Sequence, residues 1–106
     1  MPSDTVIVFM TVPDEAKGAE IGKTLVTEGL AACCNIVPAI RSIYKWKGEV
    51  CDEGEALCIM KTRAALFKTL EKRAKELHPY EVPEIICVDI KDAHQPYLSW
   101  ISEVTK

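Results

Sequence analysis

The stretch "LAACCNIVPAIRSIYKWKGEV", residues 30–50, decides the fold of this chain. It predicts one long strand that is interrupted at Pro38, because proline cannot donate to a strand ladder. The pair "KG" at 47–48 predicts the tip of a hairpin, and "EVCDEGEALCIMKT", residues 49–62, predicts the returning strand. The run "DEG" at 52–54 predicts a bulge or twist in that second strand, and it is also the alternative position for the hairpin tip. An extended hairpin is therefore the centre of the predicted fold.

Helices and strands are also predicted on both sides of this hairpin. Before it, "TVIVFMTV" (5–12) predicts a buried strand, and a helix follows up to about Glu28, with Asp14 as its N-cap and Gly29 as its end. After it, the sequence predicts a helix over 63–77 with Thr62 as N-cap, the strand "EIICVDI" (84–90) and a short terminal helix over 95–104. The predicted buried stripes are Gly18, Ile21, Gly22, Leu25 and Val26 on the first helix, Leu66, Leu70, Ala74 and Leu77 on the second, and Tyr97, Leu98 and Ile101 on the third.

The predicted order is β-α-β-β-α-β with a helix at the end. This order is typical of an α+β, ferredoxin-like sandwich, in which two helices cover one face of an antiparallel sheet. The 106 residues predict a single domain over 1–106. The second sheet face and the long hairpin with Tyr44 and Trp46 then need a cover, and self-association is the simplest way to supply one.

Composition narrows the class of protein. With 48% hydrophobic residues, 27% charged residues and a net charge of -3, the chain lacks the basic surface that nucleic-acid binding needs, so no nucleic-acid partner is expected. No apolar run approaches the roughly 20 residues that cross a bilayer, and the amino terminus is a poor signal peptide. Five cysteines without a C-x-x-C spacing fit a cytoplasmic protein, and Cys58 and Cys87 are expected to serve as packing residues.

The connector "ELHPYEVPEII", residues 76–86, holds the candidate site. His78 is a possible ligand for copper, zinc or nickel, although an imidazole at the end of a helix also has a purely structural role. A thiol–imidazole pair between Cys33 or Cys34 and His78, or a pair of carboxylates at Glu81 and Glu84, would suit an enzyme. Nothing local supports either pair, so the sequence predicts a binding protein and keeps an enzyme as the alternative.

Three motifs resemble the CutA proteins, which are named for divalent-cation tolerance. They are "LAACCNIVPAIRSIYKWKGEV" (30–50), "LHPYEVPEI" (77–85) and "YLSWI" (97–101), supported by "TVPDEA" (11–16) and "KT" (61–62). The resemblance implies a ferredoxin-like subunit in a homotrimer whose long hairpins cross the subunit boundaries. It also implies a cytoplasmic binding or sensor protein linked to copper tolerance. The trimer is similar to that of PII signalling proteins, which leaves a small-molecule ligand between subunits as an alternative.

The resemblance also implies where a divalent metal would bind. The copper ligands proposed in the family are a cysteine at the end of the first strand and two consecutive histidines before "PY". Met10 and Leu77 occupy the first two of these positions in this chain, and only His78 retains a ligand. The expectation is therefore weak binding of Cu²⁺ or another divalent cation at His78, with no organic cofactor. Cys33 matches a cysteine that recurs in some relatives.

Overall fold

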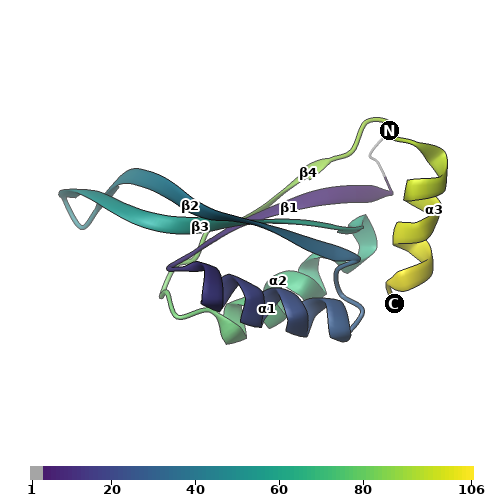
Figure 1. Cartoon of the computed structure of the whole chain (residues 1–106), viewed down its shortest axis with the longest axis horizontal. Helices are drawn as coiled ribbons and strands as arrows, with labels where there is room; N and C mark the ends of the chain where they lie inside the picture. Colours follow the sequence, from purple (N-terminus) through teal and green to yellow (C-terminus); the bar gives the residue numbers. More distant parts are fainter. Residues whose placement is uncertain (1–3) are drawn as a thin grey trace.

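A computed structural model describes residues 4–106 as a four-stranded sheet with helices on one face (Figure 1). Its elements are β1 (Thr5–Val12), α1 (Glu15–Thr27), β2 (Cys33–Trp46), β3 (Glu49–Arg63), a 3-10 turn (Ala64–Leu66), α2 (Phe67–Leu77), β4 (Ile85–Asp89) and α3 (Gln95–Val104). The strands lie in the order β2-β3-β1-β4, and every neighbouring pair is antiparallel. The predicted ferredoxin-like order is confirmed. Residues 1–3 of the predicted domain lie outside the described residues.

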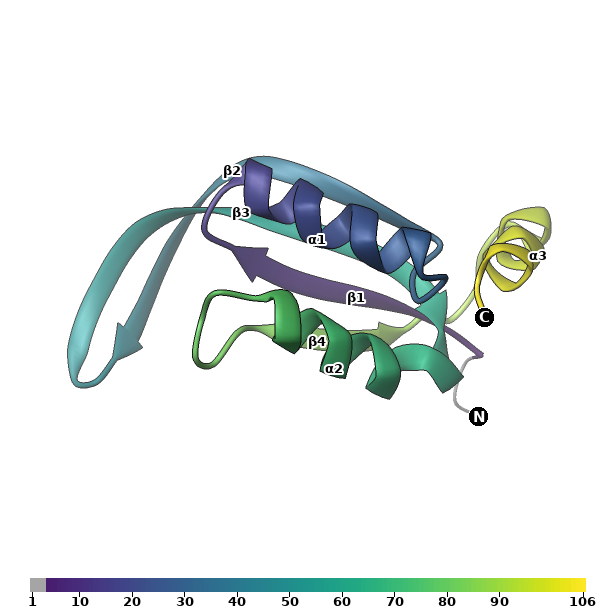
Figure 2. The same ribbon diagram turned by 90° about the horizontal axis from the view of Figure 1, so that it is seen from below.

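The β2–β3 hairpin extends well beyond the two helices (Figure 2). Its tip lies where the sequence predicts it, because Trp46 pairs with Glu49 and Gly48 has a φ of 83°. A left-handed conformation of this kind suits a tight hairpin turn and costs glycine little. The hairpin tip at 47–48 is therefore confirmed.

The irregularity in the hairpin lies on β2 and not on β3. Val37 pairs with Leu57 and Ile40 pairs with Glu55, so two residues of β2 face one residue of β3. Pro38 is one of these two residues of β2, which agrees with the predicted interruption of the strand. The bulge predicted at 52–54 is wrong, since those residues pair in regular register with 41–43.

Helix α1 begins and ends as its sequence predicts. The Asp14 side chain accepts a hydrogen bond of 2.8 Å from the Lys17 backbone N–H and so caps the first turn. At the other end the Gly29 N–H donates to the Val26 carbonyl. The buried face comprises Gly18, Ile21, Gly22 and Leu25. Val26 was also predicted to be buried but is 39% exposed, because it lies at the margin of the stripe.

Helix α2 begins later than the sequence predicts. Thr62 is not its N-cap, because this residue pairs with Val6 inside the sheet and its buried hydroxyl donates to the Leu30 carbonyl at 2.7 Å. The helix starts at Phe67 after the 3-10 turn and has no side-chain cap. Leu70 and Ala74 are its buried residues.

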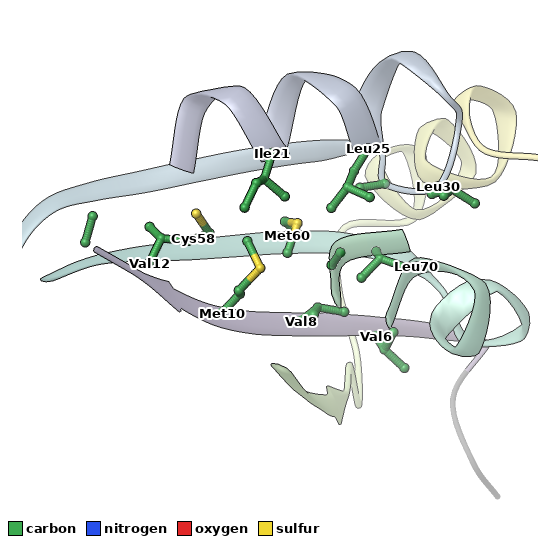
Figure 3. Packing of buried hydrophobic residues seen from close by; sticks show 13 residues of the cluster. Val6, Val8, Met10, Val12, Ile21, Leu25, Leu30, Cys58, Met60 and Leu70 are labelled. Atoms are coloured by element: carbon green, nitrogen blue, oxygen red, sulfur yellow. The ribbon is translucent and has the colours of Figure 1, made fainter. Parts of the chain in front are cut away.

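The hydrophobic core lies between the sheet and helices α1 and α2 (Figure 3). Alternate residues of β1 and β3 supply most of it, as the two-residue period of a strand requires. Its fully buried side chains include Val8, Met10, Val12, Ile21, Leu25, Cys58, Met60 and Leu70. Cys58 is the packing residue that the sequence predicts. Cys87 is not, because it lies exposed on the edge strand β4.

The opposite face of the sheet carries apolar side chains that neither α1 nor α2 covers. The register places on it Ile7, Phe9, Val37, Leu57, Ile59, Ile86 and Val88. Ile86 is 52% exposed and Val88 is 47% exposed. Contiguous apolar surface of this kind usually marks an interface.

Helix α3 lies at the end of the sheet that is remote from the hairpin tip (Figure 1). Of its three predicted buried residues, Ile101 is fully buried, Leu98 is half-buried and Tyr97 is 39% exposed. No helix in the described part of the chain is long and apolar enough to span a membrane.

The close approach of α1 to the sheet can be tested at its glycines. A Cβ added at Gly22 would lie 2.9 Å from the Cys34 Sγ, whereas one added at Gly54 would meet nothing within 4 Å. We expect Gly22→Ala to lower the free energy of unfolding by about 1–3 kcal/mol, because overpacking outweighs the gain in helix propensity. Gly54→Ala should be neutral or stabilise by roughly 0.5–1 kcal/mol. Urea unfolding of both variants measures the difference, and equal stabilities would contradict the close packing.

Candidate functional site

His78 lies at the end of α2 and is only 7% exposed. Its Nε2 donates to the Thr11 carbonyl at 2.7 Å, and its Nδ1 accepts from the Tyr80 backbone N–H at 3.1 Å. This pair of partners defines a neutral imidazole protonated on Nε2. Both nitrogens are therefore occupied, and the residue ties α2 to the end of β1 and orders the connector that follows.

The two other positions that the resemblance assigns to copper do not complete a site. Met10 is fully buried in the core, and Leu77 packs against that core and offers no donor atom. Within residues 4–106, no three His, Cys, Asp or Glu side chains gather into a group that could hold a metal. In this conformation the three positions do not fit a Cu²⁺ ion, and the ligand role of His78 stays a prediction.

Two phenol–carboxylate pairs lie near His78, where the hairpin leaves the body of the domain. The Tyr80 hydroxyl donates to Glu55 Oε2 at 2.8 Å, and the Tyr44 hydroxyl donates to Glu53 Oε2 at 2.9 Å. The Tyr80 ring also packs against the imidazole, with ring centroids 4.8 Å apart. Because Glu55 is only 9% exposed, its carboxylate depends on Tyr80 for a donor.

These pairs hold both phenols in their neutral form. Burial, together with the hydrogen bond to Glu55, raises the pKa of Tyr80. The hydrogen bond to Glu53 raises the pKa of Tyr44 to about 12. The charge of each carboxylate disfavours a second negative charge beside it, so neither phenol is a general base near neutral pH.

Glu53 and Glu55 were not predicted as site residues. The run "DEGE" suggested a bulge, whereas its regular strand register gives Glu53 and Glu55 the two-residue spacing that places them on one face. The two-residue spacing of these glutamates was the sequence feature that could have predicted a shared acidic face on this strand.

The thiol–imidazole pair that the sequence left open is not assembled in this structure. Cys33 and Cys34 point to opposite faces of β2, and the Cys33 Sγ lies 3.6 Å from the Tyr97 hydroxyl. Both ring nitrogens of His78 have backbone partners, so neither thiol is paired with it. Glu81 and Glu84 are exposed and form no ion pair in the part of the chain that the structure describes.

The fold defines a ferredoxin-like α+β protein with an extended β2–β3 arm, and the candidate site of His78, Tyr80 and Glu55 lies beside that arm. Residues 6–104 match the family described as CutA1 divalent ion tolerance protein, and the chain belongs to that family. A Thermus thermophilus protein named divalent-cation tolerance protein CutA is 48% identical over 99 residues, which cover 93% of this chain and 96% of that protein.

The similarity extends to eukaryotic proteins and to solved structures. "Protein CutA" of Mus musculus is 38% identical over all 106 residues, and this chain spans 60% of its length. The solved structure of the divalent cation tolerance protein from Thermus thermophilus superposes with a TM-score of 0.93 at 46% identity, and covers 96% of this chain and 99% of that one. The names of the two Thermus thermophilus proteins describe divalent-cation tolerance and no enzymatic reaction.

The buried Tyr80–Glu55 pair makes a testable prediction. Tyr80→Phe should lower the free energy of unfolding by about 1.5–3 kcal/mol, because it leaves a buried carboxylate without its donor. Tyr44→Phe is the matched control, since Glu53 is exposed and regains water, and a change within about 0.5 kcal/mol is expected there. Thermal unfolding at neutral pH compares the two variants.

The pH dependence of stability provides a second measurement on the same pair. The folded state raises the pKa of Tyr80, so it favours the protonated phenol. Its contribution is complete below the usual pKa of about 10 and is lost as the pH rises through the raised value. Wild type should therefore lose more stability than Tyr80→Phe above pH ~10. Parallel pH curves would contradict this role.

Proposed function

We propose that this chain is the subunit of a cytoplasmic, homotrimeric binding protein that contributes to divalent-cation tolerance. The observation that carries the proposal is the apolar sheet face that α1 and α2 leave uncovered, continuous with a projecting hairpin. Ile43, Trp46 and Val50 of that hairpin are 65%, 42% and 71% exposed. Apolar side chains on an arm of this length gain little in an isolated subunit and much when a second copy buries them.

Assembly also explains why both edges of the sheet are open. Strands β2 and β4 form these edges, and each leaves backbone N–H and C=O groups without a strand partner in the subunit. Natural proteins cover or pair such edges. Hairpins that reach across subunit boundaries would pair the long β2 edge, and three copies is the number that the family resemblance implies.

The proposed ligand is a divalent cation, bound weakly and with His78 as one ligand. Nδ1 is the nitrogen that can be freed, because its partner is the backbone N–H of Tyr80 in an otherwise exposed connector. Breaking that neutral hydrogen bond costs about 1 kcal/mol. A cation must meet this cost before it gains a ligand, which limits its affinity. Oxygen or nitrogen donors from a neighbouring subunit would complete the coordination.

The hairpin makes the assembly testable. Light scattering of the wild-type protein should give the mass of three chains, and Trp46→Ala should weaken assembly by about 2 kcal/mol or more, as truncation of a buried aromatic anchor does. Lys72→Ala, on the exposed side of α2, is the control and should leave assembly unchanged. Coincident dilution curves for Trp46→Ala and wild type would show that the hairpin is not in the interface.

The metal prediction calls for a Cu²⁺ titration against a competing chelator. His78→Gln is the informative variant, because its amide can still donate to the Thr11 carbonyl but has no basic nitrogen for a metal. We expect saturable binding by wild type, its loss in His78→Gln, and no change in His94→Gln, which alters the exposed histidine before α3. Equal binding by wild type and His78→Gln would remove His78 from the site without affecting the trimer proposal.

A further inference from the structure

Four sulfur atoms lie together in the layer between α1 and the sheet, on residues that the proposed function does not use. Cys34 pairs with Met60 across β2 and β3, and Cys58 pairs with Met10 across β3 and β1. Cys58 and Met60 are two residues apart on β3 and so share the helix-facing side. We call Met10, Cys34, Cys58 and Met60 the sulfur cluster, and Figure 3 shows Met10, Cys58 and Met60 in this layer.

The two thiols of the sulfur cluster are diagonal neighbours on one face of the hairpin, because Cys34 pairs with Met60 and Cys58 lies two residues before Met60 on β3. The neighbouring Cys58 side chain, together with burial, raises the pKa of Cys34, and the neighbouring Cys34 side chain lowers the pKa of Cys58. Two glycines of α1, Gly18 and Gly22, lie close to the two thiols on the helix side. A Cβ added at Gly18 would lie 3.1 Å from the Cys58 Sγ, and one added at Gly22 would lie 2.9 Å from the Cys34 Sγ.

One of these thiols borders a groove that opens to the surface. The groove has a volume of about 310 Å³ and lies between α1 and β2. Cys34 and Ile36 line it from the strand, and Ala19, Gly22, Lys23, Val26 and Thr27 line it from the helix. Cys34 is half-buried whereas Cys58 is fully buried, so a small ion entering the groove meets Cys34 first and Cys58 behind it.

We propose that Cys34 and Cys58 form a binding site for a soft monovalent cation, Cu(I) or Ag(I), with the thioethers of Met10 and Met60 as a soft lining. Thiolate and thioether sulfur select such ions, whereas Mg²⁺ and Ca²⁺ require oxygen ligands. Structural Zn²⁺ takes four ligands from thiolate, imidazole or carboxylate, and this layer offers only two of them. Its two thiols are not part of the proposed divalent site at His78, although Met10, which lines it, stands at one of the copper positions that the resemblance implies.

Binding at this site exchanges protons for the ion. Each thiol loses its proton, so one cation displaces two protons and leaves a two-coordinate bis-thiolate complex with a single negative charge. Lys23 lines the groove from α1, and its positive charge would offset that of the complex. Affinity should accordingly rise with pH, and no oxidant or reductant takes part.

The test is an anaerobic Cu(I) titration of the reduced, metal-free protein against a colorimetric Cu(I) chelator. Wild type should bind one Cu(I) per chain, and Cys34→Ala and Cys58→Ala should each fail to compete with the chelator. Cys33→Ala is the matched control, because its thiol neighbours Cys34 in sequence but lies on the other face of β2. Its binding should equal that of wild type. Wild-type binding retained in Cys34→Ala, or lost in Cys33→Ala, would overturn the assignment.

A measurement on the unaltered protein guards against variants that fold poorly. Alkylation of wild type with and without one equivalent of Ag(I), followed by fragmentation mass spectrometry, reports each cysteine separately. Ag(I) should slow the alkylation of Cys34 and leave that of the exposed Cys87 unchanged. An unchanged rate at Cys34, or protection of Cys87 in its place, would show that the cation does not occupy the groove.

Discussion

A four-stranded sheet has two faces to bury, and this chain has core helices for only one of them. Helices α1 and α2 lie on the same side, where they enclose the core. The other side presents Ile86 and Val88 at the edge of an apolar surface that continues toward the hairpin. Because both core helices lie on one side, the other sheet face leaves apolar surface exposed to water, and a partner would bury it. The proposed self-association rests on this arrangement of the helices more than on any single contact.

The hairpin shows how sequence irregularities position this arm. A bulge such as the one at Pro38 increases the local twist of a strand, and this one lies in β2 before the part that pairs with 49–54. Beyond it, the Arg41 guanidinium forms a bidentate ion pair with Asp52, at 2.8 and 2.6 Å, and the Tyr44 hydroxyl is held by Glu53. These contacts link β2 to β3 beyond the cover of the helices. Because they are exposed to solvent, each contributes little to the free energy of unfolding.

The order of the elements could be predicted from the sequence because hydrophobic period and turn chemistry agree along the chain. The β-branched run 5–12, the cap at Asp14 and the turn at 47–48 each have a local cause, and each was confirmed. The failures have tertiary causes. Threonine is a residue type that often caps helix N-termini, but Thr62 pairs with Val6 and so belongs to β3, which continues to Arg63. Cys87 lies in an apolar run, but that run forms an edge strand, and a sequence does not reveal which strand is at the edge.

The candidate site was harder to predict, because its parts come from elements that are far apart in the chain. His78 was singled out from the sequence as the one residue of its connector with a ligand role, and that role stays a prediction. Its partners are backbone groups of Thr11 and Tyr80, which leave no mark on the sequence. The same reasoning separates the two proposed metal sites. At His78 a cation competes with hydrogen bonds that order the connector, whereas at the sulfur cluster it replaces only the protons of two thiols on one face of neighbouring strands. A soft ion should therefore bind at the sulfur cluster without rearranging the fold. A divalent ion at His78 must first break the hydrogen bond between Nδ1 and the Tyr80 backbone N–H.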